Sequence, residues 1–149
     1  MPVFEHNLPS LKKGNTVVPA RDVLHLAGAC VNIVIAHPNP DNSASHSGVA
    51  LIDTGAIRTA IDERICKKLN LTPSAQVQMS HAGGTAMRTC YAAQISFPQL
   101  LPRPISMPRT LSVDLSGNKL PIIALVGRDI LAHMKFVYNG PRGRIEIAY

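Results

Sequence analysis

The sequence predicts an all-β protein with a single compact domain and one or two short helices. Its 149 residues are the usual length of one domain, and 46% hydrophobic against 16% charged residues is enough to build a core. Twelve prolines and ten glycines leave little room for long helices and favour strands joined by turns. Two continuous apolar runs, residues 48–52 and 121–126, have the pattern of buried strands.

The individual elements follow from apolar patterns and turn residues. The longest apolar stretch, residues 23–36, alternates in its second half, which predicts a strand. Two extended arms around Gly83 and Gly84 predict a β-hairpin. The other expected elements are loops over 37–47 and 98–108, helices over 59–71 and 129–134, and strands over 48–52, 111–115, 121–126, 135–138 and 144–148.

The chain is expected to divide once. Residues 1–22 are polar and rich in turn residues, so we expect an N-terminal extension or edge segment there. Residues 23–149 hold all the strong strand signals, and we expect them to form the domain.

The charge pattern argues against a nucleic-acid partner. Fifteen Lys and Arg face nine Asp and Glu, a formal net charge of +6, which could attract polyanions. The basic residues are scattered without a long run, however, which is typical of a solvated surface. Aromatic residues make up only 4% of the chain and tryptophan is absent, so stacking platforms for bases are not expected.

The cysteines and the N-terminus indicate a cytoplasmic protein that does not enter a membrane. Cys30, Cys66 and Cys90 cannot all pair and show no CxxC spacing, so we expect buried free thiols in a reducing compartment. The first residues lack a secretory pattern, and the longest apolar run is too short to cross a bilayer.

Residues 53–55, Asp-Thr-Gly, carry the strongest chemical signal. Asp53 directly follows a buried strand, so its carboxylate can be held rigidly and still face a cleft. Gly55 lets the backbone approach that carboxylate closely enough for an N–H to donate to it. Taken alone, the tripeptide favours an ordinary turn, because Asp-Thr-Gly is good turn chemistry by itself.

The order of motifs resembles the retropepsin-like aspartic proteases, the family of retroviral proteases and their cellular and bacterial relatives. The matching pattern is an apolar strand, Asp-Thr-Gly-Ala at 53–56, Thr-Ala-Ile at 59–61, a Gly-Gly hairpin, and a second apolar run into Gly-Arg-Asp-Ile-Leu at 127–131. The resemblance covers residues 23–149. It implies a closed β-barrel or sandwich, the acid protease fold.

The resemblance also implies roles for particular residues. It maps the catalytic aspartate onto Asp53, supported by Thr54 and Gly55, and the substrate-covering flap onto residues 77–91. It implies neither a metal nor an organic cofactor. The flap and subsite residues would be Ala56, Met79, His81, Ala82, Gly83 and Gly84, and the residues packed behind the active loop would be Gly127, Arg128 and Asp129.

One departure from the family concerns charge. Retroviral members carry an acid soon after the Gly-Ala pair, able to meet the arginine of the Gly-Arg motif, whereas this chain has Ile57 and Arg58 there. Arg128 therefore needs another partner. Three candidates are open: Asp62, Glu63, or Asp129 of a second subunit.

The chemistry of an aspartic protease requires two carboxylates that share one proton. A chain of 149 residues has no room for two halves of a bilobal enzyme and contains one Asp-Thr-Gly. The second carboxylate is therefore expected to be Asp53 of another copy, placed by two-fold symmetry. The resemblance implies the same homodimer, with Thr54 interlocking across the axis and the C-terminal strand in the dimer sheet.

The expected function is thus a homodimeric aspartic endopeptidase that hydrolyses peptide bonds in a peptide or protein substrate. The alternative keeps the fold but drops the chemistry, as a catalytically silent peptide-binding or dimerisation module. A basic nucleic-acid-associated protein is a weaker third hypothesis. The six histidines show no HExxH motif and no close pair, so we expect no metal site, although His81 beside the flap tip could contact substrate.

Overall fold

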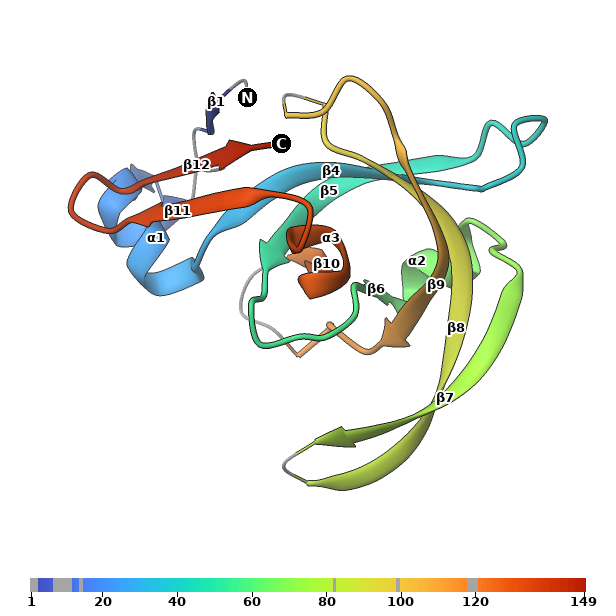
Figure 1. The fold of residues 1–149 in the computed structure, drawn as a ribbon. Coiled ribbons are helices and arrows are strands. Elements are labelled where there is room, and N and C mark those ends of the chain that lie inside the picture. Colours follow the sequence, from blue (N-terminus) through green and yellow to red (C-terminus); the bar gives the residue numbers. More distant parts are fainter. Residues whose placement is uncertain (1–2, 7–11, 14, 82, 99, 118–120) are drawn as a thin grey trace.

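A seven-stranded sheet in the order β4-β5-β10-β6-β9-β8-β7 organises the chain in the computed structural model, which describes residues 3–6, 12–13, 15–81, 83–98, 100–117 and 121–149. Because β4 also pairs with β8, the sheet closes into a barrel, and β7 extends beyond it (Figure 1). The strands are β4 (Cys30–Ala36), β5 (Ser45–Ile52), β6 (Ala60–Asp62), β7 (Pro73–His81), β8 (Gly84–Ser96), β9 (Ile105–Val113) and β10 (Ile122–Val126).

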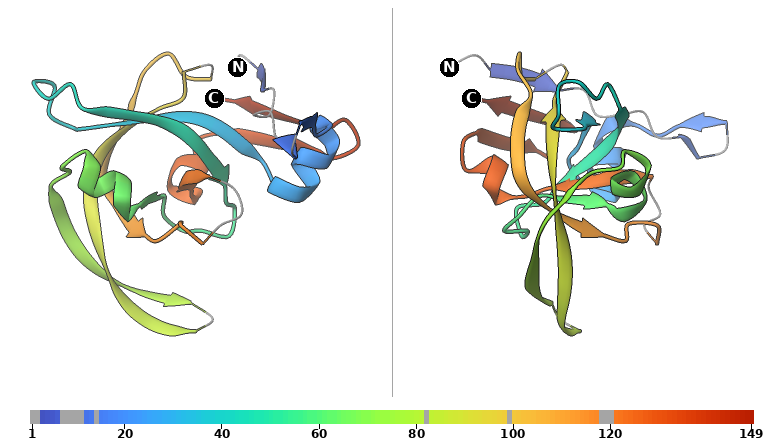
Figure 2. Two further views of the ribbon diagram at one scale, coloured as in Figure 1. Left: turned by 180° about the vertical axis from the view of Figure 1, so that it is seen from behind. Right: turned by 90° about the vertical axis from the view of Figure 1, so that its right-hand side faces the viewer.

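Smaller elements flank the barrel. A three-stranded sheet places β12 (Arg144–Ala148) between β1 (Val3–His6) and β11 (Lys135–Asn139). In both views of Figure 2, the arm formed by β7 and β8 projects away from this sheet. The other elements are the β2 (Lys12–Lys13) and β3 (Thr16–Val17) ribbon, and the helices α1 (Ala20–Ala27), α2 (Glu63–Lys68) and α3 (Arg128–Leu131). No helix in the described part of the chain is long and apolar enough to cross a membrane.

The strand order around β10 positions the Asp-Thr-Gly segment. β10 lies between β5 and β6, parallel to β5 and antiparallel to β6. Since β5 and β6 follow each other in the chain, residues 53–59 must cross the end of β10 to connect them. We call these residues the catalytic loop, after the role that the sequence analysis expects of Asp53.

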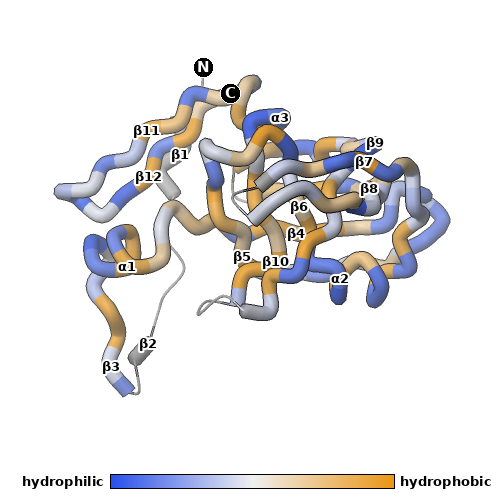
Figure 3. Tube along the Cα trace, turned by 90° about the horizontal axis from the view of Figure 1, so that it is seen from below, coloured by the Kyte–Doolittle hydropathy of each residue, from blue (hydrophilic) through white to orange (hydrophobic). Residues whose placement is uncertain are grey.

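The core fills the barrel with branched apolar side chains. Alternate residues of β4 are buried, among them Val31, Ile33 and Ile35, and the same cluster includes Ile61 and Ile95. Figure 3 shows hydrophobic residues along β4 and along the second half of β5. Each fully buried side chain of this size contributes about 1.5–3 kcal/mol to the free energy of unfolding. The rigid barrel therefore supports the catalytic loop.

The predicted fold class, mostly β with a closed barrel, is confirmed, and the helices show where the element predictions were wrong. The structure describes three helices rather than one or two. The expected strand over 23–36 begins at Cys30, because α1 occupies the first half. Pro19 precedes this helix and Gly28 ends it with φ 78°, a conformation that favours glycine.

Three further boundaries differ from the sequence-based predictions. The expected helix over 59–71 begins only at Glu63, because residues 60–62 form β6 and the Asp62 side chain caps α2. β9 enters the expected loop over 98–108, and Pro108 lies beside an irregularity in the β8–β9 register, where a missing donor is tolerated. β5 begins at Ser45, inside the expected loop over 37–47. The expected division between residues 22 and 23 falls within α1 and stays a prediction.

Candidate active site

Asp53 sits where β5 leaves the barrel. Its backbone N–H donates to the Val126 carbonyl at 3.0 Å, which continues the β5–β10 pairing by one residue. Its Oδ1 accepts hydrogen bonds from the N–H groups of Gly55 at 2.9 Å and Ala56 at 3.2 Å. Backbone amides thus fix the orientation of the carboxylate. Its second oxygen, Oδ2, has no hydrogen-bond partner in the described part of the chain, so it is available for chemistry.

Thr59 fixes the other end of the catalytic loop. It is fully buried, and its hydroxyl donates to Asp129 Oδ1 at 2.7 Å while accepting from the Gly127 N–H at 3.1 Å. The Thr59 N–H also donates to Asp129 Oδ2 at 2.9 Å. Thr59 belongs to the matching motif at 59–61, but no site role was predicted for it from the sequence, because its partner Asp129 lies 70 positions away.

The backbone of residues 127–129 lies directly against the catalytic loop. The N–H of Arg128 donates to the Ala56 carbonyl at 2.9 Å. A Cβ atom added at Gly127 would lie 2.5 Å from the carbonyl carbon of Arg58, closer than such atoms approach in proteins. Only glycine fits there without moving the loop. The structure therefore places the predicted residues 127–129 behind the loop.

The Arg128 side chain is exposed, and the two partners expected for it within the chain are engaged elsewhere. Asp62 is fully buried and forms an ion pair with Arg64 at 2.8 Å. The side-chain hydrogen bond from Arg64 holds the pKa of Asp62 below its ordinary value. Glu63 lies 3.7 Å from the ammonium group of a lysine one turn further along α2. Asp129 of a second copy stays a prediction as a partner of Arg128.

β7 and β8 form the predicted hairpin, which we call the flap. The two strands pair in register from Ala75 opposite Cys90 out to His81 opposite Gly84. Gly84 has φ 124°, a conformation that L side chains rarely adopt, so the turn requires glycine there. Ala82, predicted at the tip, lies outside the described residues, and a substrate contact at His81 stays a prediction.

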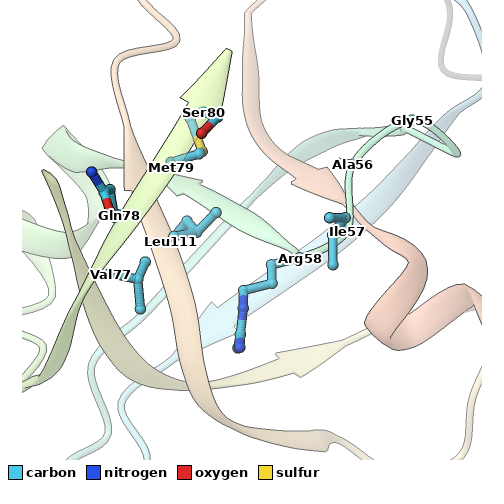
Figure 4. A pocket seen from close by; sticks show the side chains of 9 residues that line it. All are labelled: Gly55, Ala56, Ile57, Arg58, Val77, Gln78, Met79, Ser80 and Leu111. Atoms are coloured by element: carbon cyan, nitrogen blue, oxygen red, sulfur yellow. The ribbon is translucent and has the colours of Figure 1, made fainter. Parts of the chain in front are cut away.

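A cavity of about 510 Å³ separates the catalytic loop from the flap. Ala56 and Met79, both predicted to contact substrate, line it from opposite sides (Figure 4). Gly83 and Gly84 belong to the turn of the hairpin and are not among the lining residues. Thr54 and Gly55 are both exposed, and Gly55 lines the cavity. The lining residues are Gly55, Ala56, Ile57, Arg58, Val77, Gln78, Met79, Ser80 and Leu111.

Other kinds of site find little support in the described residues. The three cysteines are buried and free, as predicted. Burial raises the pKa of the Cys66 thiol to about 11, so it stays protonated at neutral pH and is a poor nucleophile. No group of three or more His, Cys, Asp or Glu side chains in this part of the chain could hold a metal ion.

No family model and no curated protein matches the chain. Among solved structures, it is similar to the EIAV protease in complex with an inhibitor, with 21% identity and a TM-score of 0.46, covering 70% of this chain and 85% of that one. It is also similar to a retropepsin-like aspartic protease from Rickettsia conorii, with 16% identity and a TM-score of 0.44, covering 81% and 92%. The activity of the chain has to be inferred from its own residues.

Proposed function

We propose that this protein is an aspartic endopeptidase whose active site forms between two copies of the chain. The observation that carries the proposal is the Asp53 carboxylate, held by the backbone N–H groups of Gly55 and Ala56. Gly55, two residues after Asp53 in the chain, lines the cavity that separates the catalytic loop from the flap. A fixed acid beside a cleft wide enough for side chains is the arrangement that peptide hydrolysis needs.

The second carboxylate of the pair is best supplied by Asp53 of another copy. Asp62 is engaged with Arg64 and with the N–H of Leu115, and Asp129 is engaged with Thr59. The remaining described aspartates lie in other parts of the fold: Asp22 in α1, Asp41 in the loop before β5, and Asp114 after β9, bonded to Ser116.

In such a pair the two carboxylates share one proton, because like charges a few ångströms apart do not ionise together. The ionised carboxylate takes a proton from a water molecule as the water oxygen attacks the peptide carbonyl carbon, and the protonated carboxyl donates its proton to the carbonyl oxygen. Breakdown of this tetrahedral intermediate transfers a proton to the amine nitrogen and breaks the C–N bond. The products are a carboxylic acid and an amine, and activity should peak at acidic pH.

The exposed surface of the chain suits a two-fold assembly. Thr54 and Gly55 are exposed in the single chain, and in the proposed dimer they would face the same residues of the second copy. β12, however, already pairs with β1 on one side and β11 on the other. In a sheet shared between two copies, the strands of the second copy would therefore pair with β1 or β11. The C-terminal strand β12 would lie at the centre of its own sheet, away from that contact.

The competing hypothesis is a peptide-binding or dimerisation module that uses the same cavity without hydrolysis. Asp53→Asn separates the two hypotheses, because asparagine keeps the shape of the side chain but cannot exchange the proton. Asp41→Asn is the matched control, since Asp41 lies in an exposed loop outside the site. Each variant is compared with the wild type for cleavage of a peptide library between pH 3 and 7, for sedimentation and for thermal unfolding.

We expect Asp53→Asn to lower the rate of cleavage by about a thousandfold or more, with sedimentation and melting temperature unchanged. Asp41→Asn should cleave like the wild type. Cleavage by Asp53→Asn at the wild-type rate would refute the proposal. A wild type that binds peptides but cleaves none across this pH range would establish the binding module instead.

A further inference from the structure

The charged groups that line the cavity between the catalytic loop and the flap are of one sign, positive. Arg58 is the only ionisable residue among those that line it, and no carboxylate faces it from the described residues of the lining. Figure 4 shows the Arg58 side chain extending from the catalytic loop into the space opposite Val77 of the flap. Arg58 is exposed, and none of the ion pairs found in the described part of the chain involves it. Its guanidinium is therefore free to pair with a ligand.

A second arginine projects from the same face of the flap. Arg88 lies directly opposite Val77 in the β7–β8 register, and residues directly opposite each other point to the same side of a sheet. Val77 lines the cavity. The Nε atom of Arg88 is buried and has no hydrogen-bond acceptor within the described residues. Because an unpaired buried donor is costly, an incoming acceptor on this face of the flap would be stabilising.

The rest of the lining explains why a side chain would be held there. Ile57, Val77 and Leu111 supply apolar surface, which would exclude water from a side chain once it enters. A guanidinium can form two parallel hydrogen bonds to a carboxylate, and this pairing strengthens as water is excluded. A basic side chain in the same place would meet a like charge, and none of the residues that line the cavity carries an acid to compensate it.

We propose that this cavity selects peptide substrates with an acidic side chain near the bond to be cleaved, and that Arg58 sets this selectivity. The inference deepens the proposed function and rests on it. Arg58 acts here on substrate choice and takes no part in bond cleavage. Arg88 adds positive potential from the flap side.

The test uses matched peptides. A proteome-derived peptide mixture cleaved by the wild type identifies a cleaved sequence and the positions around the bond where acidic residues are enriched. That sequence is then made as a pair that differs by Glu or Gln at the enriched position, and kcat/KM is measured for both at pH 6, where a glutamate side chain is ionised. The enzyme variants are Arg58→Gln and, as the matched control, Arg103→Gln, an exposed arginine in the connection between β8 and β9.

We expect the wild type and Arg103→Gln to prefer the Glu peptide by about tenfold or more, and Arg58→Gln to cleave the two peptides within about twofold of each other. The preference of the wild type should also disappear as the pH falls below the pKa of the substrate glutamate, about 4.3. Arg58→Glu should favour a Lys peptide over the Glu peptide.

The outcomes keep the two proposals apart. If the wild type cleaves peptides but shows no acidic enrichment and no Glu preference, the inference about the cavity is wrong and the protease proposal stands. If Arg58→Gln keeps the full Glu preference, Arg58 does not set selectivity. If the wild type cleaves no peptide, and Asp53→Asn binds peptides as well as the wild type does, the protease proposal fails. The inference about the cavity then fails with it. The comparison of peptides on the wild type remains informative even if an Arg58 variant unfolds.

Discussion

The catalytic loop and the flap enclose the same cavity, but they are held in place in different ways. The loop depends on contacts between distant parts of the sequence, through the buried Thr59 hydroxyl and its partners Gly127 and Asp129. The outer flap depends on its own two strands, and its residues near the turn are largely exposed. In β8, fully buried residues appear only from Cys90 onwards, where the strand joins the barrel.

This difference suits the two parts of a site in which one group must be fixed and the other must admit a chain. Segments with few buried contacts open at low free-energy cost, whereas segments tied into the core open only with the whole fold. In the proposed protease, the loop would hold a carboxylate in one orientation while the flap moves to admit and release peptide. The predictions below test this contrast.

The largest effect is expected at Gly127, where loop and β10 backbone meet. In Gly127→Ala the new Cβ would lie 2.5 Å from the Arg58 carbonyl carbon, so the loop has to move. We expect the free energy of unfolding to fall by about 3 kcal/mol or more, measured by urea denaturation. Gly117→Ala is the control, because an added Cβ there meets nothing within 4 Å. Equal stability of the two variants would contradict the tight packing of the loop.

A smaller effect is expected at Thr59. Valine matches threonine in shape but leaves the Gly127 N–H and the Asp129 carboxylate without the hydroxyl, so Thr59→Val should lower the free energy of unfolding by about 2–3 kcal/mol. Thr110 is an equally buried threonine, and its hydroxyl donates to the Tyr91 carbonyl at 2.9 Å inside the barrel. Thr110→Val should also destabilise the protein, but only Thr59→Val should lower kcat. A loss of kcat in both variants would mean that the loop network has no special role.

Asp62, the last residue of β6 and the cap of α2, makes the stability of this region depend on pH. Hydrogen bonding to Arg64 lowers the pKa of Asp62 in the folded chain below its ordinary value of 3.8. The stabilisation is therefore complete above that ordinary value and is lost as the pH falls through the folded value. Urea midpoints measured between pH 6 and pH 2 should fall less steeply for Asp62→Asn than for the wild type. Parallel curves would show that Asp62 contributes no pH dependence.

The smallest effects on stability are expected in the flap. Met79 is partly buried against a small cluster that includes Leu111, so Met79→Ala should lower the free energy of unfolding by about 1 kcal/mol. Met87 lies on β8 with 60% of its surface exposed, so Met87→Ala should change the free energy of unfolding by less than about 0.5 kcal/mol. Thermal unfolding of both variants checks this. A flap substitution that destabilises the fold as much as Gly127→Ala would remove the contrast between the two regions.

Much of the fold and the outline of the site could be predicted because their signals are local. Continuous apolar runs marked β5 and β10, and the Gly-Gly pair marked the flap turn. The position of Asp53 directly after an apolar run was enough to place it at the end of a buried strand. Arg58 can be read directly from the sequence, but the sequence does not show that it lines a cavity together with residues of the flap.

The remaining features depend on contacts that join distant residues. Thr59 meets Asp129 only because β10 inserts between β5 and β6. Pro108 could enter a strand because the β8–β9 register is irregular beside it. The first half of residues 23–36 became helix α1, although Val23 and Leu24 are as apolar as strand residues. For Thr59 and Pro108 the outcome was decided by tertiary packing rather than by local preference. The ends of α1, in contrast, are marked locally by Pro19 and Gly28.

The central claim, that each active site takes one Asp53 from each of two chains, is tested most directly by mixing subunits. Wild type and Asp53→Asn are co-refolded in varied proportions at constant total protein, and peptide cleavage is measured against the fraction of wild type. If both aspartates are needed and subunits pair at random, activity should follow the square of that fraction, so an equal mixture retains about a quarter of the wild-type rate. Activity that falls in direct proportion, with about half remaining in the equal mixture, would show that one chain suffices and would contradict the shared site.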